Sequence, residues 1–233
     1  MNTERIRRNF DTVQRLIAEA ARRSDRSADA VRLVAVTKKS PAESIRALVA
    51  CGARDLGENY PQELWSKIEA LADLDASVRW HLIGHLQSNK VKKTVSKVRM
   101  IHSVDSLNLL RVLDASAQGL SDPPAVCLQV NTSGEASKHG WTIEQILSDA
   151  ASIADCRTIP IVGLMTMAAM GTTAEEARSS FIRLRELRDG LGQRTDLPLV
   201  ELSMGMSNDF EVAIEEGATL VRVGSALFEG VEP

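Results

Sequence analysis

Residues 33–41 of the chain read Leu33-Val34-Ala35-Val36-Thr37-Lys38-Lys39-Ser40-Pro41. The run from Leu33 to Val36 is short and apolar, which is typical of a buried strand, and Pro41 suits the first turn of a helix. A strand that passes at once into a helix is the unit from which parallel α/β folds are built. This stretch therefore predicts an α/β fold, and the rest of the chain indicates which one.

Lys38 stands at the carboxyl end of this predicted strand. Burying an unpaired ammonium group is costly, so the side chain needs either water or a chemical partner. Two interpretations follow from this stretch alone. Lys38 is either an ordinary surface lysine or a partly desolvated amine nucleophile of the kind that forms Schiff bases with aldehydes.

The alternation of strand and helix recurs along the whole chain. Eight short strands separated by helices, at intervals of very roughly 25 residues, favour a (β/α)8 TIM barrel. A doubly wound open sheet is the second interpretation, because periodicity does not distinguish a closed sheet from an open one. Besides the first strand, we predict strands over residues 53–56, 78–82, 99–104, 125–131, 159–165, 199–203 and 219–223.

The helices follow from apolar residues at three- and four-residue spacing. Residues 3–23 form an extra amphipathic helix before the first strand, and no linker or low-complexity tract interrupts residues 1–233, which we expect to form a single domain. The other helices are predicted over residues 41–51, around 61–71, from 87 onwards, around 107–113, over 141–154 and 173–191, and from Asn208 and Asp209 onwards.

The composition is that of an ordinary globular protein, with 44% hydrophobic and 25% charged residues among 233. A net charge of −3 points to neither a nucleic acid nor a membrane surface as partner. The sequence shows no signal peptide and no apolar run near the roughly 20 residues of a membrane span, so we expect a cytoplasmic protein. Separately, we expect a monomer, and the sequence does not indicate whether surface helices pair into a dimer. Reduced thiols, without a disulfide or a zinc site, are expected for Cys51, Cys127 and Cys156.

Polar and small residues follow almost every predicted strand. In barrels of this kind the active site lies at the carboxyl ends of the strands, so these residues are the candidates for a site. In chain order they are Lys38, Glu58, Asn59, His81, Gly84, Ser103, Asp105, Asn131, Met165, Thr166, Ser203, Gly205, Ser207, Arg222, Gly224 and Ser225.

The last two strand ends carry the features of an anion site. Residues 203–209 combine a glycine, hydroxyl groups and the start of a predicted helix, and Arg222-Val223-Gly224-Ser225 adds a permanent cation. Barrels frequently bind phosphate through the loops after strands 7 and 8. The alternative is a pair of helix caps and a structural arginine. A lysine together with a phosphate site suggests pyridoxal 5′-phosphate (PLP), which has an aldehyde and a phosphate.

Several blocks of the sequence resemble one family in the same order. The chain resembles the pyridoxal-phosphate homeostasis proteins, which are single-domain, fold-type-III barrels similar to the N-terminal domain of alanine racemase. The resemblance spans about residues 3–229, and Leu82 and Phe228-Glu229 depart from the commonest pattern. The blocks are Val36-Thr37-Lys38, Leu56-Gly57-Glu58-Asn59-Tyr60-Pro61-Gln62-Glu63, residues 80–90, Gly163-Leu164-Met165, Ser203-Met204-Gly205-Met206-Ser207 and Arg222-Val223-Gly224.

The resemblance implies a role for each matching residue. Strand alternation places Lys38 and Lys39 on opposite faces, and only the resemblance indicates that Lys38 is the one that faces the cofactor. In this interpretation Lys38 carries the Schiff base (an aldimine), Ser207, Gly224 and Ser225 hold the phosphate, Arg222 lies beside the phosphate or the pyridine nitrogen, Asn59 lies near the ring hydroxyl, and Val36 and Met165 pack against the ring.

The expected role is that of a carrier and not of an enzyme. If Arg222 faces the pyridine nitrogen, that nitrogen stays unprotonated, because a guanidinium group offers donors only. Racemases of the related barrel take a second base from a tyrosine in another domain, whereas the single tyrosine here is Tyr60. We therefore expect a protein of intracellular PLP homeostasis that hands PLP to apo-enzymes. The alternatives are a small fold-type-III amino-acid racemase and a barrel in which Lys38 acts on a sugar phosphate.

Two further stretches have open interpretations. The basic run of residues 90–99 is expected to be a solvated helix face, with an anion or partner site as the alternative. The loop of residues 131–140 contains Lys138, which is either a secondary cofactor contact or a lysine without a role.

Overall fold

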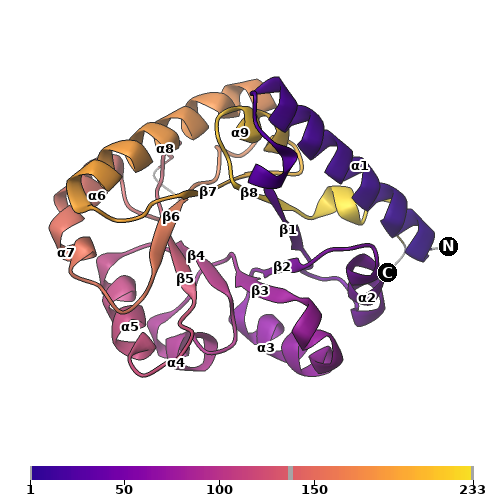
Figure 1. Ribbon diagram of the computed structural model, residues 1–233, viewed down its shortest axis with the longest axis horizontal. Coiled ribbons are helices and arrows are strands. Elements are labelled where there is room, and N and C mark those ends of the chain that lie inside the picture. The colour runs from indigo at the N-terminus through magenta and orange to yellow at the C-terminus, as the bar shows by residue number, and fades with distance from the viewer. Residues whose placement is uncertain (1, 136–138, 232–233) are drawn as a thin grey trace.

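The strands close into a parallel barrel. The structure is a computed structural model that describes residues 2–135 and 139–231, so Lys138 lies outside the described residues. Each strand pairs with the next, and β8 pairs back onto β1, which confirms the closed barrel over the open sheet (Figure 1). Within the described residues the strands are β1 Arg32–Val36, β2 Asp55–Glu58, β3 Arg79–Leu82, β4 Met100–Val104, β5 Ala125–Gln129, β6 Ile161–Met165, β7 Glu201–Met206 and β8 Leu220–Val223.

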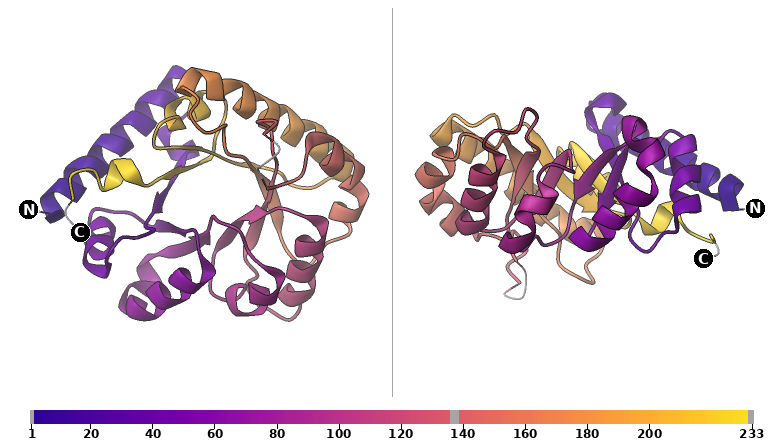
Figure 2. Two further views of the ribbon diagram at one scale, coloured as in Figure 1. Left: turned by 180° about the vertical axis from the view of Figure 1, so that it is seen from behind. Right: turned by 90° about the horizontal axis from the view of Figure 1, so that it is seen from below.

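The helices lie outside the strands, as the views from behind and from below show (Figure 2). In the part of the chain that the structure describes, no helix has both the length and the apolar character needed to cross a bilayer. The α-helices are α1 Asn2–Arg23, α2 Ala42–Ala50, α3 Pro61–Ala70, α4 Val91–Thr94, α5 Leu107–Ala117, α6 Ile143–Ser148, α7 Ala150–Ala154, α8 Ala174–Thr195 and α9 Phe210–Glu215.

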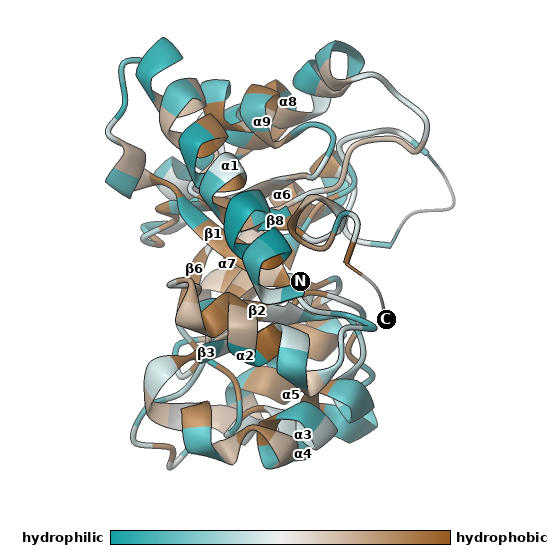
Figure 3. Cartoon of the chain, turned by 90° about the vertical axis from the view of Figure 1, so that its right-hand side faces the viewer, coloured by the Kyte–Doolittle hydropathy of each residue, from teal (hydrophilic) through white to brown (hydrophobic). Residues whose placement is uncertain are grey.

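The N-terminal helix α1 completes the outer ring. After β8 the chain forms only a 3-10 turn, Ser225–Leu227, where the repeating unit calls for a helix. Helix α1 packs against α9 and α2 and so covers this part of the barrel. The Arg5 Nε donates to the carbonyl of Glu229, so the first turns of α1 lie beside the segment around Glu229. Figure 3 shows α1 in the foreground of this side of the molecule.

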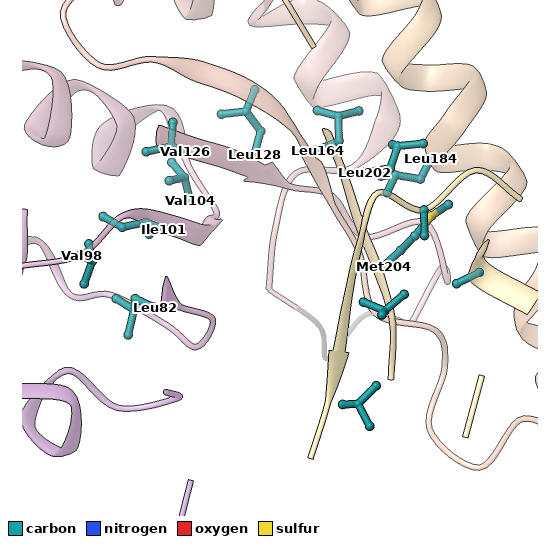
Figure 4. Close-up of a cluster of buried hydrophobic side chains, with 14 of the residues drawn as sticks. Leu82, Val98, Ile101, Val104, Val126, Leu128, Leu164, Leu184, Leu202 and Met204 are labelled. Carbon is teal, nitrogen blue, oxygen red and sulfur yellow. The ribbon is translucent and has the colours of Figure 1, made fainter. Parts of the chain in front are cut away.

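The two faces of the strands bury different side chains. Alternate residues point outward and pack under the helices, among them Leu82, Ile101 and Val126 (Figure 4). The residues between them point into the barrel, because side chains alternate along a strand. The apolar part of this interior is a small cluster of Val34, Met100, Cys127, Met165 and Leu220.

Three helix predictions were wrong in extent. The helix predicted over residues 141–154 is two short helices, since Thr142 and Gln145 form a capping box that starts α6, and Asp149 separates α6 from α7. The polar helix from residue 87 is a 3-10 turn followed by the single turn α4. The helix predicted from Asn208 begins at Phe210, because β7 continues to Met206 and a turn follows it.

The strand predictions were correct in number and order but shifted at their ends. The second strand lies at Asp55–Glu58 and not at residues 53–56, and Glu58 therefore belongs to the strand. The predicted fifth strand ends early, at Gln129, although Val130 still forms a single bridge with Trp141. Strand pairing to both neighbours, which a single segment does not reveal, sets these limits.

Candidate functional site

A cavity of about 560 Å³ lies at the carboxyl ends of the strands. Residues that are distant in sequence converge on it, from β1, β5, β7 and β8 and from the loops that follow β1, β2, β3, β5, β6, β7 and β8. Of the eight predicted site residues, seven line the cavity and Met165 does not. Met165 is fully buried in the interior cluster, whereas Met167 lines the cavity. The seven predicted site residues that line the cavity are Val36, Lys38, Asn59, Ser207, Arg222, Gly224 and Ser225.

Lys38 is the lysine that lines the cavity among the residues that the structure describes. Its neighbour Lys39 adopts a left-handed conformation, with φ of 62°, so the chain turns directly after Lys38. The Lys38 side chain is exposed, whereas partial desolvation was one of the two expectations from the sequence. It is therefore an accessible primary amine at the mouth of the cavity.

The backbone just before Lys38 is held by a buried group of polar side chains. The Thr37 hydroxyl donates to Oε1 of Glu58 over 2.5 Å. The Lys67 ammonium of α3 donates to the same oxygen over 2.7 Å and to the Thr37 carbonyl over 2.6 Å. These three bonds attach the end of β1 to β2 and α3, so the position from which Lys38 extends is fixed.

Glu58 serves this anchor and does not line the cavity. Its side chain is completely buried, and burial raises the pKa of Glu58 although the hydrogen bonds from Lys67 and Thr37 oppose the increase. Its second oxygen, Oε2, has no hydrogen-bond partner among the described residues. The prediction that Glu58 belongs to the strand-end site is therefore correct only in the sense that it supports Lys38.

The candidate phosphate side is built from the ends of β7 and β8. The Ser207 hydroxyl accepts from the backbone amides of Gly224, over 3.3 Å, and of Ala226, over 3.5 Å. A Cβ at Gly224 would lie 3.2 Å from the Cβ of Val36, so only a glycine lets these two strand ends approach without displacement. Because the Ser207 oxygen accepts these two bonds, its O–H remains as a donor for an anion.

Arg222 is the buried cation of the site. Its guanidinium is only 4% exposed and donates to the Ser203 hydroxyl over 2.7 Å and to the Thr166 carbonyl over 2.9 Å. Burial lowers the pKa of Arg222 to about 10, so the group is still charged at neutral pH. Two of its nitrogens are fixed by the barrel while the residue lines the cavity.

Asn59 is held against the loop after β3. A Cβ at Gly84 would lie 2.2 Å from the Asn59 carbonyl oxygen, so Gly84 is needed for this approach. Tyr60, the next residue, is 60% exposed and does not line the cavity. The one tyrosine of the sequence is therefore not among the residues that line the cavity.

A polar group on the same rim contains two residues that sequence reasoning did not single out, His85 and His139, together with Asp105, which it did. His85 and His139 line the cavity, and their rings stack with centroids 5.3 Å apart. The Nδ1 of His85 lies 2.9 Å from a carboxylate oxygen of Asp105. One ligand atom from each of the three lies within 4.8 Å of the others, so the group has the donors for a divalent transition metal or for proton transfer. The three residues follow three different strands, and no spacing in the sequence indicated their proximity.

The basic run of residues 90–99 lies away from the cavity. Lys93 places its ammonium 4.1 Å from the ring centroid of Trp65, and Arg99 pairs with the exposed Asp122. These are contacts of a solvated surface, and we keep that interpretation as a prediction.

Comparisons with known proteins agree with this geometry. The model of the family described as alanine racemase, N-terminal domain, matches residues 1–232. A pyridoxal phosphate homeostasis protein of Aquifex aeolicus is 40% identical over 225 residues, which cover 97% of this chain and 96% of the relative. PipY of Synechococcus elongatus, solved with PLP bound, is 41% identical with a TM-score of 0.81, over 91% of this chain and 99% of PipY.

A more distant structure shows how far the fold extends. An alanine racemase of Corynebacterium glutamicum matches with 16% identity and a TM-score of 0.71. The match covers 99% of this chain and 61% of the racemase. At this identity the likeness shows the fold alone.

Proposed function

This chain belongs to the pyridoxal phosphate homeostasis protein family, and we propose that it binds PLP in the cavity at the carboxyl ends of the strands. The observation that carries the proposal is the convergence of an accessible lysine, a pair of serines and a buried arginine on that one cavity. The size of the cavity, about 560 Å³, suits a small-molecule cofactor.

The donor set fits the chemistry of PLP. Lys38 is the primary amine that the cavity offers, and PLP would supply the aldehyde with which such an amine condenses, with loss of water. The Ser207 and Ser225 hydroxyls would donate to the phosphate, and Gly224, whose N–H donates to the Ser207 oxygen, would hold that hydroxyl in place beside it. Arg222 provides the fixed cation beside the ring or the phosphate.

The other predicted residues position the ring. Asn59 lines the cavity beside Gly84 and donates to or accepts from the ring hydroxyl. Val36 packs against the ring as an apolar wall of the cavity. Met165, which was expected to do the same, is buried in the interior cluster and does not line the cavity.

We further propose that the protein carries PLP and does not catalyse a reaction of it. A guanidinium group offers hydrogen-bond donors only. If Arg222 faces the pyridine nitrogen of PLP, that nitrogen stays unprotonated and the PLP ring is a weaker electron sink. Tyr60, the one tyrosine of the sequence, lies outside the cavity and so offers no second base there. The proposed role is to hold PLP as a monomer and to hand it to apo-enzymes that depend on it.

A titration with PLP tests the binding. The wild-type protein is expected to develop a visible absorbance band that saturates with PLP, and Lys38→Ala is expected to abolish it. Lys39→Ala is the matched control, since Lys39 is the adjacent exposed lysine and does not line the cavity; it is expected to keep the band. A wild-type protein without the band would refute the proposal.

A racemase is the second candidate function, and one observation favours it. The His85 imidazole, which is hydrogen-bonded to Asp105, lines the same cavity as Lys38 and offers a second acid–base group. Incubation with PLP and L-alanine decides between the two functions. A racemase forms D-alanine and loses this turnover in His85→Ala, whereas a carrier shows no more turnover than the Lys38→Ala variant.

A further inference from the structure

A continuous path of buried polar side chains crosses the interior of the barrel beneath the cavity. It starts at Arg222, whose guanidinium donates to the Ser203 hydroxyl over 2.7 Å. The Ser203 hydroxyl lies 2.7 Å from Nδ1 of His102, across the barrel from β7 to β4. The Nε2 of His102 lies 2.9 Å from Nδ1 of His81, and the Nε2 of His81 lies 2.9 Å from the carboxylate of Asp55.

Every side chain of this path is buried. The largest exposed fraction is 5%, at Asp55, and Ser203 and His102 are fully enclosed. A buried polar group without a hydrogen-bond partner is costly, so each break in the path leaves at least one such group in the interior. The apolar cluster of the interior offers no substitute partners.

The path connects two opposite charges. Arg222 is the cation at the cavity, and Asp55 is the carboxylate at the other end, where Arg79 binds it with two hydrogen bonds of 2.8 and 2.6 Å. In the sheet, Val34 of β1 pairs with Asp55 on one side and with Arg222 on the other. Asp55 and Arg222 are thus separated in the sheet by β1 alone. The hydrogen-bonded path between them runs the longer way round the barrel, through β3, β4 and β7.

The charges at the two ends define the direction of every hydrogen bond. Arg222 has only donors, and the ionised carboxylate of Asp55 has only acceptors. Burial lowers the pKa of His81 and, more strongly, that of His102, so both rings are neutral at pH 7.

One assignment of the protons satisfies all partners. The Nε2 of His81 carries a proton and donates to Asp55, so its Nδ1 accepts from the Nε2–H of His102. The Nδ1 of His102 then accepts from the Ser203 hydroxyl, whose oxygen accepts from Arg222. Every bond therefore points from the arginine towards the aspartate.

We propose that His102 and His81 are positioning residues for Arg222, which they hold in one orientation through Ser203 by a unidirectional chain of hydrogen bonds that ends at Asp55. The consequence for the cofactor rests on the proposed function. With two nitrogens of Arg222 tied to Ser203 and Thr166, its remaining donors stay aligned with the cavity, so binding of PLP needs no reorientation of the guanidinium.

The ring tautomers test the chain without any cofactor. The sequence has four histidines, so single substitutions assign each signal in a long-range ¹H–¹⁵N NMR spectrum. The expected result is a neutral ring with the proton on Nε2 at both His81 and His102 at pH 7. A proton on Nδ1 of His102, or a charged ring at either residue, overturns the proposal.

The affinity for PLP tests the positioning role. Ser203→Ala and His102→Leu are each expected to weaken PLP binding about tenfold, because each removes support for a charged donor. The double variant is expected to be no weaker than the weaker single variant, since the chain is then already broken. Met100→Leu is the control, because Met100 is a buried interior residue of the same strand that takes no part in the chain, and its affinity is expected to be unchanged.

Two outcomes overturn the positioning role. One is an unchanged affinity in both single variants, and the other is a multiplicative loss of about a hundredfold in the double variant, which means that the residues act independently. A wild-type protein that does not bind PLP contradicts the proposed function instead, and the tautomers then decide the inference. The ring tautomers of His81 and His102 also decide the inference if the His102→Leu variant fails to fold.

Discussion

Lys38 is the residue on which the proposed function depends, and its neighbours determine where it lies. Thr37 is bonded to Glu58 and Lys67, and Lys39 turns the chain through a left-handed conformation. Lys38 itself forms none of these bonds and stays exposed at the cavity. The buried neighbours of Lys38 therefore fix the place at the cavity from which its amine is offered.

We predict that Lys67→Met destabilises the protein by about 3 kcal/mol, because it leaves the carboxylate of Glu58 buried without its cation. The free energy of unfolding in urea measures this. The double variant Lys67→Met/Glu58→Gln removes the buried charge and is expected to recover most of the loss. Equal stability of the wild type and the single variant would show that the ion pair contributes nothing.

Gly224→Ala is expected to weaken PLP binding, since its Cβ would lie 3.2 Å from the Cβ of Val36 and 3.3 Å from the Val36 carbonyl oxygen. We expect a loss of about tenfold or more, the equivalent of about 1.4 kcal/mol. Gly190→Ala is the matched control, because a Cβ there meets nothing within 4 Å, and it should leave the affinity unchanged. Equal affinity of the two variants would argue against a close-fitting wall at Gly224.

The two buried histidines predict how stability depends on pH. Burial lowers the pKa of His81 and His102 below the ordinary value of 6.5, so the unfolded chain takes up protons that the native protein does not. The contribution of the two neutral rings to the free energy of unfolding is complete above about pH 6.5. Below that pH it decreases, by up to about 1.4 kcal/mol per pH unit for each ring.

Urea unfolding at pH 7.0 and pH 5.5 measures this decrease. His102→Leu removes one of the two groups and should lose less stability between these pH values than the wild type. Met100→Leu, which removes no titratable group, should lose as much as the wild type. The same loss in all three proteins would contradict the assignment of neutral, buried rings.

At the scale of elements, periodicity predicted the number and order of the strands and the outer helix α1, because these depend on short local patterns. It did not predict where β7 ends, since Met206 belongs to the strand through its pairing with Arg222. The capping box at Thr142 lay within a segment predicted as continuous helix, and there the local cap outweighed the longer pattern.

The candidate site was predictable where the sequence carried contiguous blocks, as for Lys38, Ser207 and Arg222. It was not predictable where single residues meet from separate strands. The path from His81 to His102 and the rim group around His85 are of this second kind, since their partners lie about 20 or more residues apart and share no spacing.

Helix α1 provides an element-scale prediction. Ile17 is buried in the face of α1 that covers the barrel, and Ile17→Ala should lower the free energy of unfolding by about 3 kcal/mol. Gln14→Ala is the control on the exposed face of the same helix and should change stability by less than about 0.5 kcal/mol. A small effect at both positions would mean that α1 is not part of the folded unit.

At the scale of the whole molecule, closure of the barrel places β1 beside β8. Lys38, near the start of the chain, therefore lines the same cavity as the candidate phosphate side, near the end of the chain. The interior path then connects Arg222 to the far side of the barrel. Both features depend on closure of the sheet, because an open sheet would leave β1 and β8 unpaired.

Borohydride reduction of the protein mixed with PLP, followed by peptide mass spectrometry, tests the central claim most directly. Reduction converts a lysine-bound cofactor into a stable adduct, so the modified residue can be located. We predict a single phosphopyridoxyl group on Lys38, with adjacent Lys39 unmodified. Modification of Lys39 or of surface lysines in place of Lys38, or no specific adduct, would contradict the claim that this cavity binds PLP through Lys38.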